Sequence, residues 1–227
     1  MSQDRIDVLR RSDLMQGMSD AEICELLQSS HVREIRCRKG DILFHEGDMP
    51  KEIYLLLAGE VHILKDTFAG RRIFISEIDA PGDLFGEVYE ALQKPYDMYV
   101  EAVTDTDILC IGNAFFRLES DTVSPAAAHV RQNLLRIFAR KAYAMHNRIK
   151  VLASGSLRGK IARFLLPQLD ANGEVMLQVS REYLAAYLAV TRPSLSRELS
   201  SMQNDGILRV SGRKVRVLDP EKLEEFL

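Results

Sequence analysis

The chain has no tryptophan and only three cysteines among its 227 residues. Cys24, Cys37 and Cys110 are scattered and form no C-x-x-C pair, which argues against a disulfide framework and favours reduced thiols. No run approaches the roughly 18 consecutive apolar residues of a membrane span. The opening stretch, MSQDRIDVLRRSDL, lacks the apolar segment of a signal peptide. We therefore expect a cytoplasmic protein with no membrane partner.

Motifs of common enzyme chemistry are also missing. The sequence has no P-loop, no H-E-x-x-H and no nucleophile elbow. A cupin-like metal enzyme is the alternative from another class, and it would need histidines and a carboxylate at ligand spacing. No H-x-H occurs, and His45 and His62 are isolated in the sequence. We therefore predict no enzyme activity, no catalytic residues and no metal ligands.

The formal net charge of −3 hides a strong asymmetry. Residues 1–120 carry 13 Lys and Arg against 23 Asp and Glu. Residues 121–157 carry 6 against 1, and residues 158–216 carry 10 against 5. An acidic half joined to a basic half indicates a sensor or scaffold attached to a nucleic-acid-binding module.

The stretch from Ser180 to Arg209 predicts two short amphipathic helices joined by a tight turn. Ser180 and Thr191 are expected N-caps, because each side chain can accept a hydrogen bond from the following first turn. Pro193 falls in the first turn of the second helix, where its missing N–H costs nothing. Apolar side chains repeat at helical spacing on one face of each helix: Leu184, Ala185 and Leu188 on the first, and Leu195, Leu199 and Met202 on the second. This pattern is typical of a helix-turn-helix, and a helical hairpin with a solvated basic face is the alternative.

Two short strand-like runs follow, Ile207–Val210 and Val215–Leu218, around the turn Ser211-Gly212-Arg213. They predict a basic hairpin, or wing, suited to phosphate contacts.

The residues before this module predict a different architecture. From Val32 to Ile111 short apolar runs, such as Ile53–Leu57, Val61–Leu64 and Ile73–Ile78, alternate with glycine-containing turns. Turn signals at this spacing favour an antiparallel barrel or roll. A short helix behind a Ser19 cap is expected before them.

A segment without glycine runs from Ser124 to Ser154 and predicts a long helix. Its apolar residues follow 4-3-4-3 spacing, the seam of a two-stranded coiled coil: Phe138, Ala142, Met145, Ile149 and Leu152. We interpret this seam as a homodimer interface that pairs two recognition helices on a palindromic site. The alternative is a helix packed on its own domain.

In this order of elements, with Pro81-Gly82-Asp83-Leu84-Phe85-Gly86-Glu87 before the long helix, the chain resembles the Crp/Fnr superfamily of bacterial transcription regulators. The resemblance implies an α+β protein: an N-terminal antiparallel β-roll (jelly roll) with short helices, a long dimerisation helix and a C-terminal winged helix-turn-helix. The expected divisions are residues 1–120, the effector or sensor domain, residues 121–154, the dimerisation helix, and residues 155–227, the DNA-binding domain. It also implies a homodimer, double-stranded DNA with an inverted-repeat promoter site, and RNA polymerase as a further partner.

The resemblance assigns residues to two sites. The expected DNA contacts are Ser180, Thr191, Arg192, Pro193, Ser194, Ser196, Arg197, Arg213 and Lys214. Arg192 and Arg197 could each bind a guanine edge, whereas Pro193 stands where well-studied members have a cytosine-reading glutamate. Ala189 replaces the turn glycine of those members, at a cost of up to about 1 kcal/mol if φ is positive there.

The effector is expected not to be cyclic AMP. In members that bind this nucleotide, an arginine followed by a small residue neutralises the phosphate, and here Tyr96 and Asp97 stand in their place. A buried phosphate would lose a charge-assisted bond and meet a carboxylate. No cofactor is assigned, and an unidentified small molecule is the expected effector. Two readings remain open: Phe85-Gly86-Glu87 is a structural turn, or it belongs to a pocket for another ligand, lined by Phe85, Gly86, Glu87, Tyr89, Tyr96, Asp97, Tyr99, Met145 and His146.

Two other sensing modes are alternatives. A haem sensor needs an axial ligand, for which His31, His45, His62, His129 and His146 are available. A thiol switch could use Cys37 if Arg36 and Arg38 lower its pKa, although an unreactive residue in a strand is the simpler interpretation. An iron–sulfur cluster of the Fnr type needs four thiolates, which three scattered cysteines do not supply.

Overall fold

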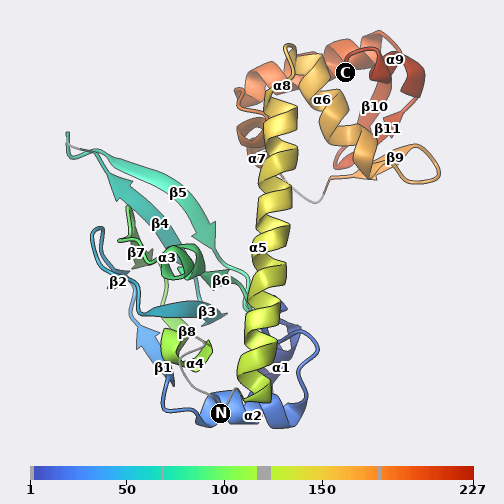
Figure 1. Cartoon of the computed structure of the whole chain (residues 1–227). Helices are drawn as coiled ribbons and strands as arrows, with labels where there is room; N and C mark the ends of the chain where they lie inside the picture. The colour runs from blue at the N-terminus through green and yellow to red at the C-terminus, as the bar shows by residue number, and fades with distance from the viewer. Residues whose placement is uncertain (1–2, 68, 117–123, 178–179) are drawn as a thin grey trace. The chain divides into compact units, whose positions relative to one another are not determined.

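The computed structural model of the chain describes residues 3–67, 69–116, 124–177 and 180–227. It divides into two compact units, Met1–Ala139 and Arg140–Leu227. The boundary falls within helix α5 (Pro125–Leu152), the long helix of Figure 1. The expected long helix over residues 124–154 is therefore confirmed.

The first unit begins with short helices. These are α1 (Gln3–Arg11), the 3-10 helix η1 (Asp13–Met15) and α2 (Asp20–Gln28). Ser19 caps α2 as expected, because its hydroxyl accepts from the Glu22 amide while the Glu22 carboxylate accepts from the Ser19 amide. Ile23 and Leu26 are buried on the inner face of α2.

Two four-stranded antiparallel sheets follow, and they confirm the expected roll. The strand order is β1-β8-β3-β6 in one sheet and β2-β7-β4-β5 in the other. The strands are β1 (Val32–Cys37), β2 (Ile42–Phe44), β3 (Glu52–Ala58), β4 (Val61–Asp66), β5 (Arg72–Ile78), β6 (Leu84–Phe85), β7 (Tyr99–Ala102) and β8 (Thr106–Gly112). Helix α3 (Glu87–Leu92) follows β6, and helix α4 (Asn113–Phe116) follows β8.

Strand β3 separates two apolar clusters in this unit. Because side chains alternate along a strand, Leu55 packs with the helices whereas Tyr54 and Leu56 pack inside the roll. Both faces of β3 are thus buried, which explains its unbroken apolar run. The turn into β4 needs glycine, because Gly59 has a φ of 92° and an added Cβ would lie 2.6 Å from the Asp105 carbonyl oxygen.

The N-terminal half of α5 packs within the first unit. Val130, Leu134 and Ile137 pack into the helical cluster. The buried Asn133 donates through its side-chain nitrogen to the carbonyls of Leu14 and Gln16, at 2.8 and 2.9 Å. This half of α5 is therefore fixed to its own chain by both packing and hydrogen bonds.

The second unit is a winged helix-turn-helix. Its helices are α6 (Leu157–Leu165), α7 (Arg181–Tyr187), α8 (Arg192–Asn204) and α9 (Pro220–Glu224), with a 3-10 helix η2 (Leu166–Gln168). Strands β9 (Glu174–Met176), β10 (Leu208–Ser211) and β11 (Lys214–Val217) form one antiparallel sheet in the order β10-β11-β9. The apolar faces of α6, α7 and α8 share one buried cluster with this sheet.

Candidate nucleic-acid interface and effector region

Both expected caps of the helix-turn-helix are present. The Ser180 hydroxyl accepts from the Tyr183 amide at 3.1 Å, and the Thr191 hydroxyl accepts from the Ser194 amide at 3.3 Å. Pro193 lies in the first turn of α8, as expected. The capping side chains and the proline in the first turn thus determine where α7 and α8 begin.

The turn between the helices forces Ala189 into a left-handed conformation, with a φ of 53°. The condition under which replacing glycine is costly is therefore met. A carbonyl near the end of α7 holds the turn, since Ala185 accepts from the Val190 amide at 2.9 Å. The left-handed region costs a residue with a Cβ about 1 kcal/mol.

Helix α8 has one buried and one solvated face. Leu195, Leu199 and Met202 are buried, whereas Arg192, Pro193, Ser196 and Arg197 are exposed and Ser194 is half-buried. The guanidinium of Arg192 lies 2.9 Å from a carboxylate oxygen of Glu182 on α7. Arg197 donates through Nε to the Pro193 carbonyl at 3.3 Å. The two arginines therefore start from different environments, one paired with an acid and one folded along its own helix.

The wing is the β10–β11 hairpin. Arg209, Arg213 and Arg216 are exposed along it. Lys214 is exposed as well, and its Nζ lies 2.6 Å from one carboxylate oxygen of Glu174 on β9, whose other carboxylate oxygen lies 4.0 Å from Arg216 Nε. Arg181 donates to the carbonyl of Gly212 at 3.2 Å, which ties the tip of the wing to the start of α7.

Sequence reasoning missed Glu174, Glu182 and Arg181 as parts of this surface. Each meets its partner from another element, so no spacing along the chain could reveal the contact.

The segment Phe85-Gly86-Glu87 joins β6 to α3. Gly86 has a φ of 79°, and an added Cβ would lie 2.9 Å from the Tyr54 ring. Phe85 and Glu87 are 3% and 2% exposed. Glycine is thus required here by backbone and neighbours alike, and Glu87 is buried at the start of α3 rather than exposed.

Tyr96 occupies the interior of the roll. It is 3% exposed, and its ring stacks on Phe44 with centroids 3.8 Å apart. Tyr54 in turn stacks on Phe44 at 5.5 Å and on Phe85 at 5.4 Å. Burial raises the pKa of both tyrosines, so both hydroxyls stay neutral. Where the resemblance implies a phosphate-binding cation, this chain has an aromatic stack.

Asp97 is held by two neighbours. The Tyr89 hydroxyl donates to one carboxylate oxygen, and Lys65 Nζ on β4 lies 3.2 Å from the other. The hydrogen bond from Tyr89, and then Lys65, lower the pKa of Asp97, whereas burial and this carboxylate raise the pKa of Tyr89 to about 12. Lys65, which sequence reasoning missed, brings a cation to this part of the roll.

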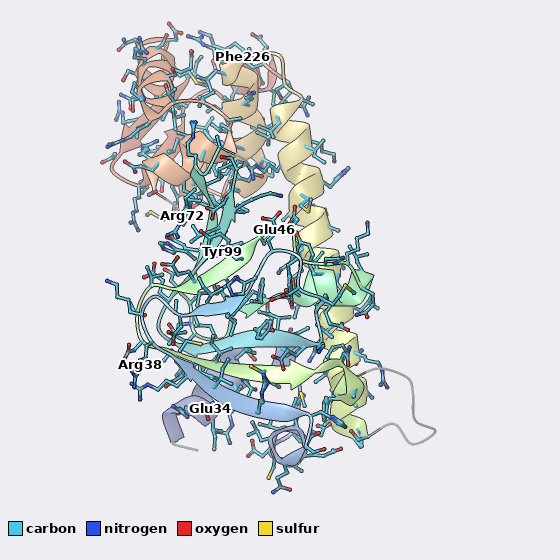
Figure 2. The ribbon with its side chains drawn as sticks, turned by 90° about the vertical axis from the view of Figure 1, so that its left-hand side faces the viewer. Glu34, Arg38, Glu46, Arg72, Tyr99 and Phe226 are labelled. Atoms are coloured by element: carbon cyan, nitrogen blue, oxygen red, sulfur yellow. The ribbon has the colours of Figure 1, made fainter. Side chains whose placement is uncertain are left out.

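Tyr99 lies on β7, the strand paired with β4, and is also buried. Its hydroxyl donates to Asp66 at 3.3 Å, and the Arg72 guanidinium lies 5.7 Å from the centre of its ring (Figure 2). Met145 and His146 are exposed on the part of α5 that belongs to the second unit, so their place in an effector pocket stays a prediction.

The thiol-switch alternative, in which Arg36 and Arg38 lower the pKa of Cys37, is not supported, and the simpler interpretation of an unreactive residue in a strand is favoured. Cys37 is buried at the end of β1, and desolvation followed by the charge of Asp41 raises its pKa. Burial likewise raises the pKa of Cys110 to about 12. Because the thiolate is the reactive form, both are poor redox switches.

His62 is isolated in sequence but not in space. On β4 and β5, His62 and Glu77 are register partners, and Glu60 lies 2.9 Å from His62 Nε2. One ligand atom from each of the three lies within 4.8 Å of the others, which is close enough to hold a metal ion. Cross-strand register, which the sequence alone does not give, brings them together.

The predicted seam of α5 is largely solvated in the single chain. Met145 and Ile149 are 66% and 63% exposed, Ala142 is exposed, and Phe138 and Leu152 are half-buried. Leu135, seven residues before Ala142, is 70% exposed and extends the same spacing.

Within the residues that the structure describes, no helix is long and apolar enough to span a membrane.

Two family profiles match the chain. The one described as "Cyclic nucleotide-binding domain" covers residues 34–118, and the one described as "Crp-like helix-turn-helix domain" covers residues 159–226.

Whole-chain relatives are transcription regulators. The chain is 31% identical over 198 residues to "Transcriptional regulator LdrP" of Thermus thermophilus, covering 83% of this chain and 94% of that one. It is 25% identical over 218 residues to the "Cyclic AMP receptor protein" of the same organism, covering 96% and 98%. The crystal structure of the Thermus thermophilus catabolite activator protein shares the fold, with a TM-score of 0.53 at 24% identity over 95% of this chain and 98% of that one.

Proposed function

The chain belongs to the Crp/Fnr family of DNA-binding transcription regulators, and from this premise we propose that it acts as a homodimer on an inverted-repeat promoter site under the control of a small molecule other than cyclic AMP. Its relatives are regulators and not enzymes. RNA polymerase is the further partner that the family implies. The proposal therefore concerns the assembly, the DNA sequence and the signal.

One observation carries the DNA-reading part: α8 is capped at Thr191, buried on its Leu195 face and solvated on the face of Arg192 and Arg197. A helix held in this way can enter the major groove, where arginine binds guanine O6 and N7 with two hydrogen bonds. Arg192 first has to exchange Glu182 for a base, so Arg197 is the stronger reader.

In vitro selection from random DNA tests this part. We expect an inverted repeat with a required guanine in each half-site, and relaxed choice at the base pair opposite Pro193, since proline offers no acceptor to a cytosine amine. Recovery of a half-site with that pair strictly fixed would contradict the proposed readout. Recovery of single, unpaired half-sites would contradict the dimer.

The homodimer is supported by the solvated apolar seam on α5. Apolar residues that repeat at heptad spacing on a helix gain stability when a second copy covers them. Two copies related by a two-fold axis would present two α8 helices to successive turns of DNA. Sedimentation of the full-length protein tests this, with a dimer expected at micromolar concentration.

The aromatic stack of Tyr96 on Phe44 supports the proposal that the effector is not cyclic AMP. Relatives are named as a cyclic AMP receptor and as cAMP-activated regulators, so this nucleotide is the obvious candidate. Here Tyr96 occupies the interior and Lys65 is engaged by Asp97, so among the described residues a cyclic phosphate meets no free cation at the position where the family supplies one. In a thermal-shift screen of the full-length protein we expect cyclic AMP to stabilise no more than uncharged nucleosides do. A cyclic AMP shift well above all other compounds would overturn this part.

A further inference from the structure

A cavity of about 490 Å³ lies in the second unit, outside both sites described above. The end of α5, helix α6, η2, the last residue of α7 and Leu227 line it. Its volume is in the usual range for small-molecule sites. It thus offers a site within the DNA-binding unit itself, apart from the roll.

The lining combines aromatic rings with two cations, Arg163 and Lys150. Tyr143, Phe164 and Tyr187 contribute aromatic surface, and Phe164 and Tyr187 meet edge to face at 5.4 Å. Arg163 is already engaged, because it donates to the Ser154 hydroxyl at 2.8 Å and to a main-chain oxygen of Leu227 at 2.7 Å. Lys150 is exposed at the rim and pairs with no acid among the described residues.

No aspartate or glutamate is among the described side chains that line the cavity, and the main-chain oxygen of Leu227, which also lines it, is held by Arg163 at 2.7 Å. Asn147 and Gln168 add amide groups that can donate to an oxygen. Aromatic walls, a cation and neutral donors together fit a flat apolar body that carries a negative charge.

A second copy on the α5 seam would leave the cavity open. At 100° per residue, the lining positions Tyr143, Asn147 and Lys150 lie on the opposite side of α5 from Met145 and Ile149. The dimer proposed above therefore does not cover it.

The cavity also adjoins the contact that joins α5 to the helix-turn-helix. Arg148 donates to the Ala186 carbonyl at 3.2 Å, and its guanidinium lies 5.5 Å from the centre of the Tyr187 ring. An occupant would touch that ring two residues before the left-handed Ala189. We propose that this cavity is a binding site for a planar aromatic carboxylate.

Isothermal titration calorimetry of the full-length protein with 2-naphthoate tests the site. We expect one molecule to bind per chain, and the uncharged isostere 2-naphthamide to bind at least about tenfold more weakly, because it forgoes the charge-assisted contact to Lys150. Lys150→Met should weaken naphthoate by a similar factor, while the matched change Lys141→Met, on the same helix outside the cavity, should leave it unchanged. Asn147→Phe, which fills the space, should abolish binding of both compounds.

Three results would overturn the proposal. The first is no naphthoate binding, and the second is naphthamide binding as tightly as naphthoate. The third is naphthoate binding that survives both Lys150→Met and Asn147→Phe, which would place it elsewhere in the protein. None of these results bears on whether the chain binds DNA as a dimer.

Discussion

Ala189 shows how a single residue can carry strain without disturbing the fold around it. Its φ of 53° is imposed by the tight turn between α7 and α8, and the helices on both sides are capped and packed. The conformational free energy of the left-handed backbone is therefore confined to one residue, where a substitution can measure it.

Ala189→Gly should raise the stability of the second unit by up to about 1 kcal/mol, because glycine adopts this conformation without a Cβ clash and Ala189 is exposed. The matched change Ala186→Gly, in the helical part of α7, should instead lower it by about 1 kcal/mol. Calorimetric unfolding of the full-length protein gives both signs. Equal destabilisation by the two changes would show that the turn stores no strain.

Arg197 is the residue on which sequence discrimination should depend most. Arg197→Ala should cost about 1–3 kcal/mol against the selected site and remove the preference at one guanine. Arg213→Ala, in the wing, should weaken all DNA sequences about equally, since a phosphate contact carries no base information. Fluorescence anisotropy with selected and scrambled DNA separates the two. The assignment fails if Arg197→Ala weakens both DNAs alike.

At the scale of elements, the sequence was enough to predict those helices whose boundaries depend on residues close together in the chain. Ser19, Ser180 and Thr191 mark helix starts because a cap contacts its own first turn, and heptad spacing marks α5. What the sequence could not reveal are contacts set by register and packing: Lys65 with Asp97, Glu60 with His62 and Glu77, and Tyr96 within an aromatic stack. Except for Glu60 and His62, which are two residues apart, each contact joins residues whose separation in the chain says nothing of their distance.

The contact between α2 and α5 is an element-scale link with a pH signature. The Glu22 carboxylate accepts from the Ser19 amide and hydroxyl, and it lies 2.5 Å from His129 Nδ1. Ser19 and then His129 lower the pKa of Glu22 from 4.5 to about 2. Because the folded-state pKa is depressed, this contact stabilises the native state above about pH 4.5 and loses its effect as the pH falls towards 2.

Glu22→Gln should therefore lower the Tm near neutral pH and flatten its decline in acid. Glu25→Gln, on the same helix, should leave the acid limb unchanged, since no hydrogen bond to Glu25 occurs among the described residues. Thermal unfolding monitored from about pH 2 to neutrality tests this. A parallel decline in Glu22→Gln and the unaltered protein would show that the contact contributes nothing.

At the scale of the whole molecule, the charge is unevenly distributed: the first 120 residues are acidic and the remainder is basic. Positive charge is concentrated where DNA is expected, while the acidic roll is disfavoured near phosphate. A single DNA-binding unit offers only one recognition helix. Pairing two copies through α5 would double the contacts and fix their spacing, so assembly and specificity should fail together.

Ile149→Glu tests that link directly. Ile149 is 63% exposed in the single chain, so the change should not impair folding, yet in a dimer it would bury two carboxylates against each other in an apolar seam. We expect a monomer at micromolar concentration, and binding to the inverted repeat at least about tenfold weaker, because each half-site must then be bound separately. Ala144→Glu adds the same charge to an exposed position of α5 outside the seam and should remain dimeric with unchanged DNA affinity. Sedimentation and fluorescence anisotropy on the same samples measure the oligomeric state and the DNA affinity. A dimeric Ile149→Glu protein would place the interface elsewhere. A monomer that still binds the inverted repeat at full affinity would show that DNA readout does not depend on dimerisation.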